Sequence, residues 1–131
     1  MEIFRLHIHV TEENRFDTET NTINMVLFDG TCEGNYFNGK ILNGGVDTQI
    51  YEKDGAGTLS ARYMLSGMDK EGVPCHLFIE NNGIVGKEET HTTPRVYTDS
   101  KSLKWLETEE LAGKIIMEND ELIISIFKNE I

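Results

Sequence analysis

The chain has 131 residues, a length typical of one compact domain, so we expect residues 1–131 to form a single domain and a two-domain enzyme is disfavoured. Its 23 acidic residues outnumber its 12 basic residues and give a formal net charge of −11, which disfavours nucleic acids and anionic membrane surfaces as partners. Hydrophobic residues make up 38% of the chain, which is enough for a folded core and argues against disorder.

The N-terminal segment 1–7 has neither the basic start nor the apolar run of an export signal. No stretch approaches the roughly 20 apolar residues that a membrane helix requires. The two cysteines, Cys32 and Cys75, lie far apart and form no C-x-x-C pair. We therefore expect a cytoplasmic protein with two reduced thiols, and a disulfide is the less favoured alternative.

Most of the chain alternates apolar and polar residues with a period of two, which is the pattern of strands with one buried face. Repeated Asn-Gly and Asp-Gly pairs indicate tight turns between antiparallel neighbours. In chain order, strands are expected over residues 4–10, 22–28, 36–42, 46–51, 58–65, 75–79, 92–98, 114–117 and 122–127.

A short helix is expected over residues 99–111, where Asp99 or Ser100 would cap its N-terminus. Its apolar side would be formed by leucines, with a tryptophan nearby: Leu103, Leu106, Leu111 and Trp105. About nine strands and one helix predict an all-β protein, an antiparallel closed or nearly closed β-barrel, because closure removes exposed strand edges. A two-sheet sandwich is the structural alternative.

The segments before and after the Asp-Gly turn at 54–55 carry a candidate polar cluster. In a hairpin centred on that turn, Asp47 would lie opposite Arg62. Gln49 would lie opposite Ser60, and all four residues would share one face while the other face is apolar. The cluster is either an exposed ion pair of small energetic value or a site in which Arg62 binds an oxyanion and Asp47 accepts a proton.

Several common sites lack their sequence motifs. No phosphate-binding loop, dinucleotide-binding glycine motif, G-x-S-x-G elbow or H-E-x-x-H helix is present. His7 and His9 share one strand face, but no further ligand stands beside them at a recurring metal-binding spacing. The sequence therefore predicts neither a metal site nor a cofactor.

Five short segments together form a family pattern. They are 44–49 (GGVDTQ), 59–65 (LSARYML), 81–83 (NNG), 92–95 (TTPR) and 103–106 (LKWL). In order and spacing they resemble the family called "domain of unknown function 3237", also known as uncharacterised protein family 0311, from about Asn21 to the end of the chain. The resemblance implies a small β-barrel without a generally assigned activity. It also implies a shared site that includes Asp47, Gln49, Arg62, Tyr63 and Trp105.

Three functions are weighed for this chain. The first is a barrel that binds a small, partly apolar organic molecule, with Arg62, Gln49 and either His91 or Arg95 at its polar end. The second is a cofactor-free lyase or isomerase in which Asp47 is the general base and Arg62 stabilises an oxyanion. In the third, the polar cluster lies at the subunit interface of a homo-oligomer.

Overall fold

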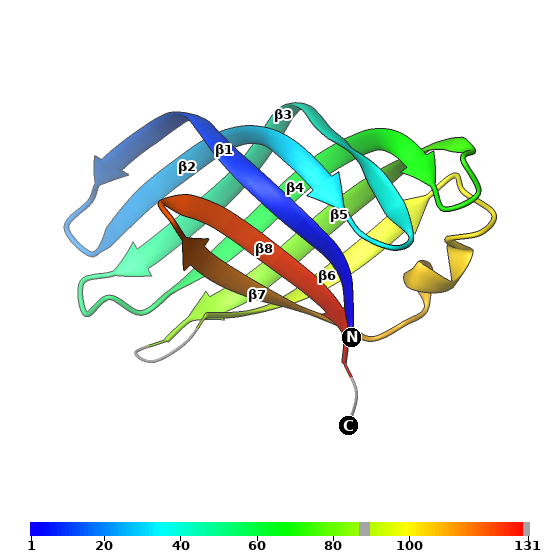
Figure 1. The fold of residues 1–131 in the computed structure, drawn as a ribbon. Coiled ribbons are helices and arrows are strands. Elements are labelled where there is room, and N and C mark those ends of the chain that lie inside the picture. The colour runs from blue at the N-terminus through cyan, green and yellow to red at the C-terminus, as the bar shows by residue number, and fades with distance from the viewer. Residues whose placement is uncertain (87–89, 130–131) are drawn as a thin grey trace.

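A computed structural model describes residues 1–86 and 90–129 of the chain. In these residues, eight antiparallel strands follow one another around a closed barrel, and β1 pairs with β8 to close it (Figure 1). The strands are β1 (Glu2–Asp17), β2 (Asn21–Glu33), β3 (Phe37–Glu52), β4 (Gly57–Asp69), β5 (Pro74–Val85), β6 (Thr90–Thr98), β7 (Leu111–Glu118) and β8 (Glu121–Lys128). The predicted all-β antiparallel barrel is confirmed.

The expected count of nine strands is one too many, because the strands predicted at 36–42 and 46–51 are a single strand, β3. Its register against β4 shifts between Ile41 and Val46, so the Asn-Gly-Gly sequence there is an irregularity within the strand. A Cβ on Gly45 would lie 2.9 Å from the Phe28 carbonyl oxygen. The glycine therefore permits a close approach of β2 to β3 here.

The helix expected after β6 is much shorter than predicted. The structure has only η1 (Lys104–Glu107), a 3-10 turn of four residues. The expected cap residues bond elsewhere, because the Asp99 carboxylate accepts from the His76 backbone N–H at 2.7 Å and the Ser100 hydroxyl donates to Asp69 at 3.1 Å. Within the described ranges, no helix is long and apolar enough to cross a membrane.

The two ends of the barrel differ. At one end, on the right in Figure 1, η1 and the β2–β3 connection lie together, with Leu103 and Leu106 fully buried. The Trp105 ring packs edge-on against Tyr36 with centroids 5.3 Å apart. We call this the helix end. The opposite end carries the β1–β2, β3–β4 and β7–β8 hairpins, and we call it the hairpin end.

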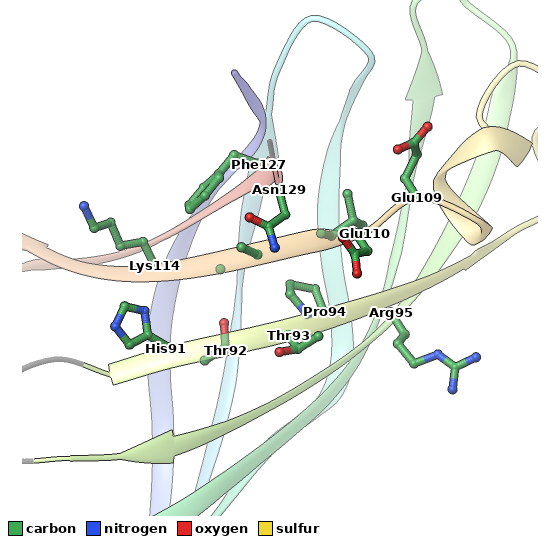
Figure 2. A pocket seen from close by; sticks show the side chains of 13 residues that line it. His91, Thr92, Thr93, Pro94, Arg95, Glu109, Glu110, Lys114, Phe127 and Asn129 are labelled. Carbon is green, nitrogen blue, oxygen red and sulfur yellow. The ribbon is translucent and has the colours of Figure 1, made fainter. Parts of the chain in front are cut away.

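The barrel is least tightly closed between β6 and β7. These strands pair at only two positions in the described part of the chain, His91 with Lys114 and Thr92 with Gly113. The Thr92 hydroxyl points toward β7 in Figure 2, and a Cβ on Gly113 would lie 2.1 Å from that oxygen. Glycine is therefore required where the two strands meet.

Both cysteines are buried and free, which confirms the prediction of two unpaired thiols. Cys32 and Cys75 belong to the main apolar core. Burial raises the pKa of the Cys32 thiol to about 12, so this group is a poor nucleophile at neutral pH.

Candidate functional site

The β3–β4 hairpin has a register one residue away from the predicted one. Asp47 pairs with Ala61, and the last pair before the turn is Tyr51 with Gly57. Five residues, 52–56, therefore lie between the two members of this last pair, and the Glu52 backbone N–H donates to the carbonyl oxygen of Ala56 at 2.7 Å. A slip of one residue exchanges the two faces of a strand. The predicted polar quartet is consequently split between the inside and the outside of the barrel.

The predicted Asp47–Arg62 pair is wrong for this reason. Arg62 lies on the outer face with its side chain 63% exposed, and its Nε atom is 3.2 Å from a Glu80 carboxylate oxygen. Asp47 and Gln49 instead face the barrel interior, where they line a cavity with residues of β4 such as Tyr63. Arg62 is therefore an outer-surface residue.

The interior cavity lies in the half of the barrel nearest the hairpin end and has a volume of about 80 Å³. That volume exceeds the roughly 10–15 Å³ that one water needs and is below the roughly 300 Å³ at which sites for drug-sized ligands begin. Its walls are Ile8, Val26, Phe28, Asp47, Gln49, Leu59, Ala61, Tyr63, Asn81, Thr92, Ile115, Leu122 and Ile124. A groove of about 410 Å³ at the hairpin end shares Gln49 with the cavity.

A short chain of hydrogen bonds fixes the carboxylate of Asp47. The Tyr51 hydroxyl donates to Gln49 Oε1 at 3.3 Å, and Gln49 Nε2 donates to Asp47 Oδ2 at 2.8 Å. These bonds use the Gln49 amide at both of its ends. The second carboxylate oxygen, Asp47 Oδ1, is buried and has no hydrogen-bond partner in the described structure.

Asp47 Oδ1 is one of several buried polar atoms that lack a partner within the described residues. The others are Asn24 Oδ1, Tyr63 OH, Asn81 Oδ1 and Thr92 Oγ1. Four of the five belong to residues that line the cavity, and Asn24 lines the adjoining groove. Since a buried polar atom without a partner costs about 1–3 kcal/mol, their concentration around one cavity makes this cavity the candidate site.

Burial sets the protonation of the two titratable residues in the cavity. It raises the pKa of the Asp47 carboxyl above its ordinary value, against the opposing effects of the Gln49 hydrogen bond and the Ser60 backbone. Burial also raises the pKa of the Tyr63 phenol, so Tyr63 is neutral at physiological pH. The cavity thus contains one carboxyl group with an elevated pKa and one neutral phenol.

Three further predicted site residues lie away from this cavity. His91 and Arg95 are exposed on β6, where they line an outer groove of about 780 Å³ over the β6–β7 junction (Figure 2). The Arg95 guanidinium lies over the Tyr97 ring, 5.9 Å from its centroid. Trp105 is at the helix end. The structure therefore brings together only Asp47, Gln49 and Tyr63 of the predicted site.

Asn81 and Thr92 were not among the predicted site residues, although both lie in segments of the family pattern. Asn81 is 4% exposed and continues the inward-facing alternation of Leu77 and Ile79 along β5. Thr92 precedes the inward-facing Val96 on β6 by four residues. A polar residue at an inward position of an otherwise apolar alternation is the signal that identifies such positions.

Comparisons with known proteins agree with this architecture. A profile of the family described as "Protein of unknown function (DUF3237)" matches residues 2–92, a region that starts earlier and ends sooner than the resemblance noted in the sequence. A UPF0311 protein from Clostridium acetobutylicum is 47% identical over 58 residues, or 44% of this chain and 34% of that protein. The match therefore spans about a third of the length of this relative.

Solved structures share the fold over nearly the whole chain. A protein of unknown function from Clostridium acetobutylicum has a TM-score of 0.83 and 28% identity, covering 99% of this chain and 98% of that one. An enzyme from Penicillium herquei has a TM-score of 0.70 and 15% identity, covering 97% and 92%, and this likeness concerns the fold alone. With the profile match over more than half of its length, the chain belongs to the DUF3237 family.

Proposed function

We propose that the barrel binds a small, partly apolar organic molecule in the interior cavity. The observation that carries this proposal is the group of unpartnered buried atoms on Asp47, Tyr63, Asn81 and Thr92 around one largely apolar space. Apolar walls with a few convergent polar groups are typical of small-molecule sites. The outer groove is larger, but Arg95, Glu110 and Lys114 are exposed there, and Glu109 lies 3.5 Å from the Lys128 ammonium.

The proposal revises the expected roles of individual residues. Asp47 and Tyr63 contact the ligand, and Gln49 orients the Asp47 carboxylate. Participation of Arg62, His91, Arg95 and Trp105 stays a prediction, and none of these four lines the cavity. The subunit-interface hypothesis loses its basis in the polar quartet, because that quartet is split between two faces, and a homo-oligomer stays a prediction.

Native mass spectrometry of the freshly purified protein tests the proposal. We expect a bound small molecule in the wild type, loss of that mass in Asn81→Leu, and its retention in Arg62→Met. Both substitutions replace a polar side chain by an apolar one, but only Asn81 lines the cavity. Equal retention in the two variants would contradict the interior site.

A second candidate is a cofactor-free lyase or isomerase with Asp47 as general base. The raised pKa of Asp47 favours it, because a general base works best with a pKa near the working pH. Arg62 lies outside the cavity, so the hydroxyl of Tyr63 or Thr92 takes over its expected role at an oxyanion. The similar structure from Penicillium herquei is that of an enzyme.

Asp47→Asn separates binding from catalysis. If the barrel is an enzyme, the variant retains the co-purifying molecule while the wild type, incubated with that molecule, converts it to a species of different mass or chromatographic retention. If the barrel only binds, neither protein changes the molecule. Conversion at the wild-type rate by Asp47→Asn would eliminate Asp47 as the base.

A further inference from the structure

The charge of the cavity walls restricts the ligand. Among the described residues that line it, Asp47 is the one acid, and there is no lysine, arginine or histidine. A carboxylate or phosphate that enters the cavity would lose its hydration and gain no cationic partner. It would also lie near the Asp47 carboxylate, and both effects disfavour the charged form of the ligand. The cavity is therefore unsuited to an anionic group.

The unpartnered atoms specify what the ligand must supply. Asp47 Oδ1 and Asn81 Oδ1 only accept hydrogen bonds, at least while Asp47 is ionised. Thr92 Oγ1 and Tyr63 OH both accept and donate. Gln49 already bonds Tyr51 through Oε1 and Asp47 through Nε2, which leaves its amide one N–H and one lone pair for further hydrogen bonds.

A hydroxyl group matches this set better than an ammonium group. A hydroxyl donates one hydrogen bond to Asp47 or Asn81 and accepts from Thr92 or Tyr63. An ammonium donates only, so it can pair with Asp47 but leaves the hydroxyl protons of Thr92 and Tyr63 unpartnered. Moving its full charge out of water into this largely apolar cavity also costs desolvation energy, which the pairing with Asp47 must offset.

Resting on the proposed function, we infer that the ligand enters the cavity with an uncharged, hydroxyl-bearing end, which donates to Asp47 or Asn81. The cavity of about 80 Å³ accommodates this end and a few carbon atoms against Phe28 and Leu59. The rest of the molecule extends past Gln49 into the groove at the hairpin end. This assignment replaces the oxyanion-binding role that the sequence suggested for the site.

The test uses three probes with one carbon chain and different end groups: butan-1-ol, butyrate and butylamine. Each is titrated into the wild type, and binding is followed through the backbone amide resonances of Asn81 and Thr92. We expect butan-1-ol to bind at least about tenfold more tightly than either charged probe, a difference of roughly 1.4 kcal/mol. Asp47→Asn should reduce the preference for butan-1-ol over butyrate, because the variant lacks the carboxylate that repels butyrate. Arg62→Met should leave this preference unchanged.

The outcomes distinguish this inference from the proposed function. Tighter binding of butyrate or butylamine at the cavity overturns the hydroxyl assignment and leaves the ligand site intact. An unchanged preference in Asp47→Asn also overturns it. If no probe shifts these resonances and native mass spectrometry shows no bound molecule, the proposed function fails and the inference fails with it.

Discussion

Asp47 differs from an ordinary surface carboxylate because one of its oxygens is buried without a partner in the described structure. Burial raises its pKa in the folded protein, so the folded state binds a proton more tightly than the unfolded chain does. The stability that the protonated group contributes is present below the unfolded pKa of about 3.8 and is lost as pH rises through the folded pKa.

We therefore expect Asp47→Asn to be more stable than the wild type at pH 7, with a smaller difference at pH 4. Urea denaturation at the two pH values measures this, and Asp120→Asn in the exposed β7–β8 turn is the matched control. If the wild type were more stable than Asp47→Asn at pH 7, the buried carboxylate would have its hydrogen-bond partners within the folded protein.

Two substitutions at Tyr63 distinguish the packing of its ring from the role of its hydroxyl. Its ring packs edge-on against Phe28 with centroids 5.3 Å apart, while its buried hydroxyl has no partner in the described residues. Tyr63→Phe should leave the free energy of unfolding unchanged or raise it by up to about 1 kcal/mol. Tyr63→Ala should lower it by about 3–5 kcal/mol. Urea titrations measure both, and a loss above about 1 kcal/mol in Tyr63→Phe would point to a hydrogen bond within the protein.

His7 lies on the outer face of β1 between two carboxylates, where Nδ1 bonds Glu121 and Nε2 lies 3.1 Å from Glu33. The hydrogen bonds to Glu33 and Glu121 raise the pKa of the imidazole. The protonated His7 imidazole contributes its full stabilisation below the pKa of about 6.5 that it has in the unfolded chain. This stabilisation is lost as pH rises through the higher pKa of the folded state.

We expect His7→Gln to lose less stability than the wild type between pH 6 and pH 8. Thermal unfolding at half-unit intervals measures the two slopes. His9→Gln on the same face is the control, because the His9 side chain is 74% exposed. Parallel slopes for wild type and His7→Gln would contradict the expected proton linkage.

At the scale of elements, the β6–β7 junction depends on the absence of a side chain at Gly113. A Cβ there would lie 2.1 Å from Thr92 Oγ1, so Gly113→Ala forces one strand to move. We expect a loss of about 1–3 kcal/mol in the free energy of unfolding, measured by urea titration. Adding Thr92→Ala removes the clashing hydroxyl and should restore part of that loss. Additive losses in the double variant would show that the contact does not limit the junction.

The strands illustrate what the sequence determines. Period-two alternation identified every strand region from β1 to β8, because burial of one face is a local property of each strand. The register of β3 against β4 was not predictable in the same way. It depends on whether the turn holds an odd or even number of residues, and the Asp-Gly pair is compatible with both. That single choice decided whether Arg62 or Ala61 faced Asp47.

The difference between local patterns and long-range pairing also explains which site residues could be predicted. Asp47 and Gln49 followed from the hairpin pattern and from the family resemblance, and Tyr63 followed from the resemblance alone. The structure brings all three to one cavity. Asn81 and Thr92 come from β5 and β6, and the registers of successive strand pairs bring them to that cavity: Asn81, for example, pairs with Ala61, the partner of Asp47. Such long-range placement leaves no spacing pattern in the sequence, apart from a polar residue at an inward position.

At the scale of the whole molecule, the barrel has one end packed with side chains and one end with room for a ligand. Trp105, Tyr36 and the buried leucines of the η1 region occupy the helix end. The cavity and its adjoining groove lie toward the hairpins. The net charge of −11 further opposes the approach of anions, in agreement with a cavity whose described lining residues include no basic side chain.

We propose that the polar atoms left unpartnered in the cavity are the contacts of a ligand. A high-resolution crystal structure of the freshly purified protein tests it most directly, through the electron density between Asp47, Asn81 and Thr92. We expect continuous density for an organic molecule within hydrogen-bond distance of Asp47 Oδ1 or Asn81 Oδ1. Separate waters that bridge these atoms, unchanged after soaking with butan-1-ol, would contradict it and would assign the polar cluster to a structural water network.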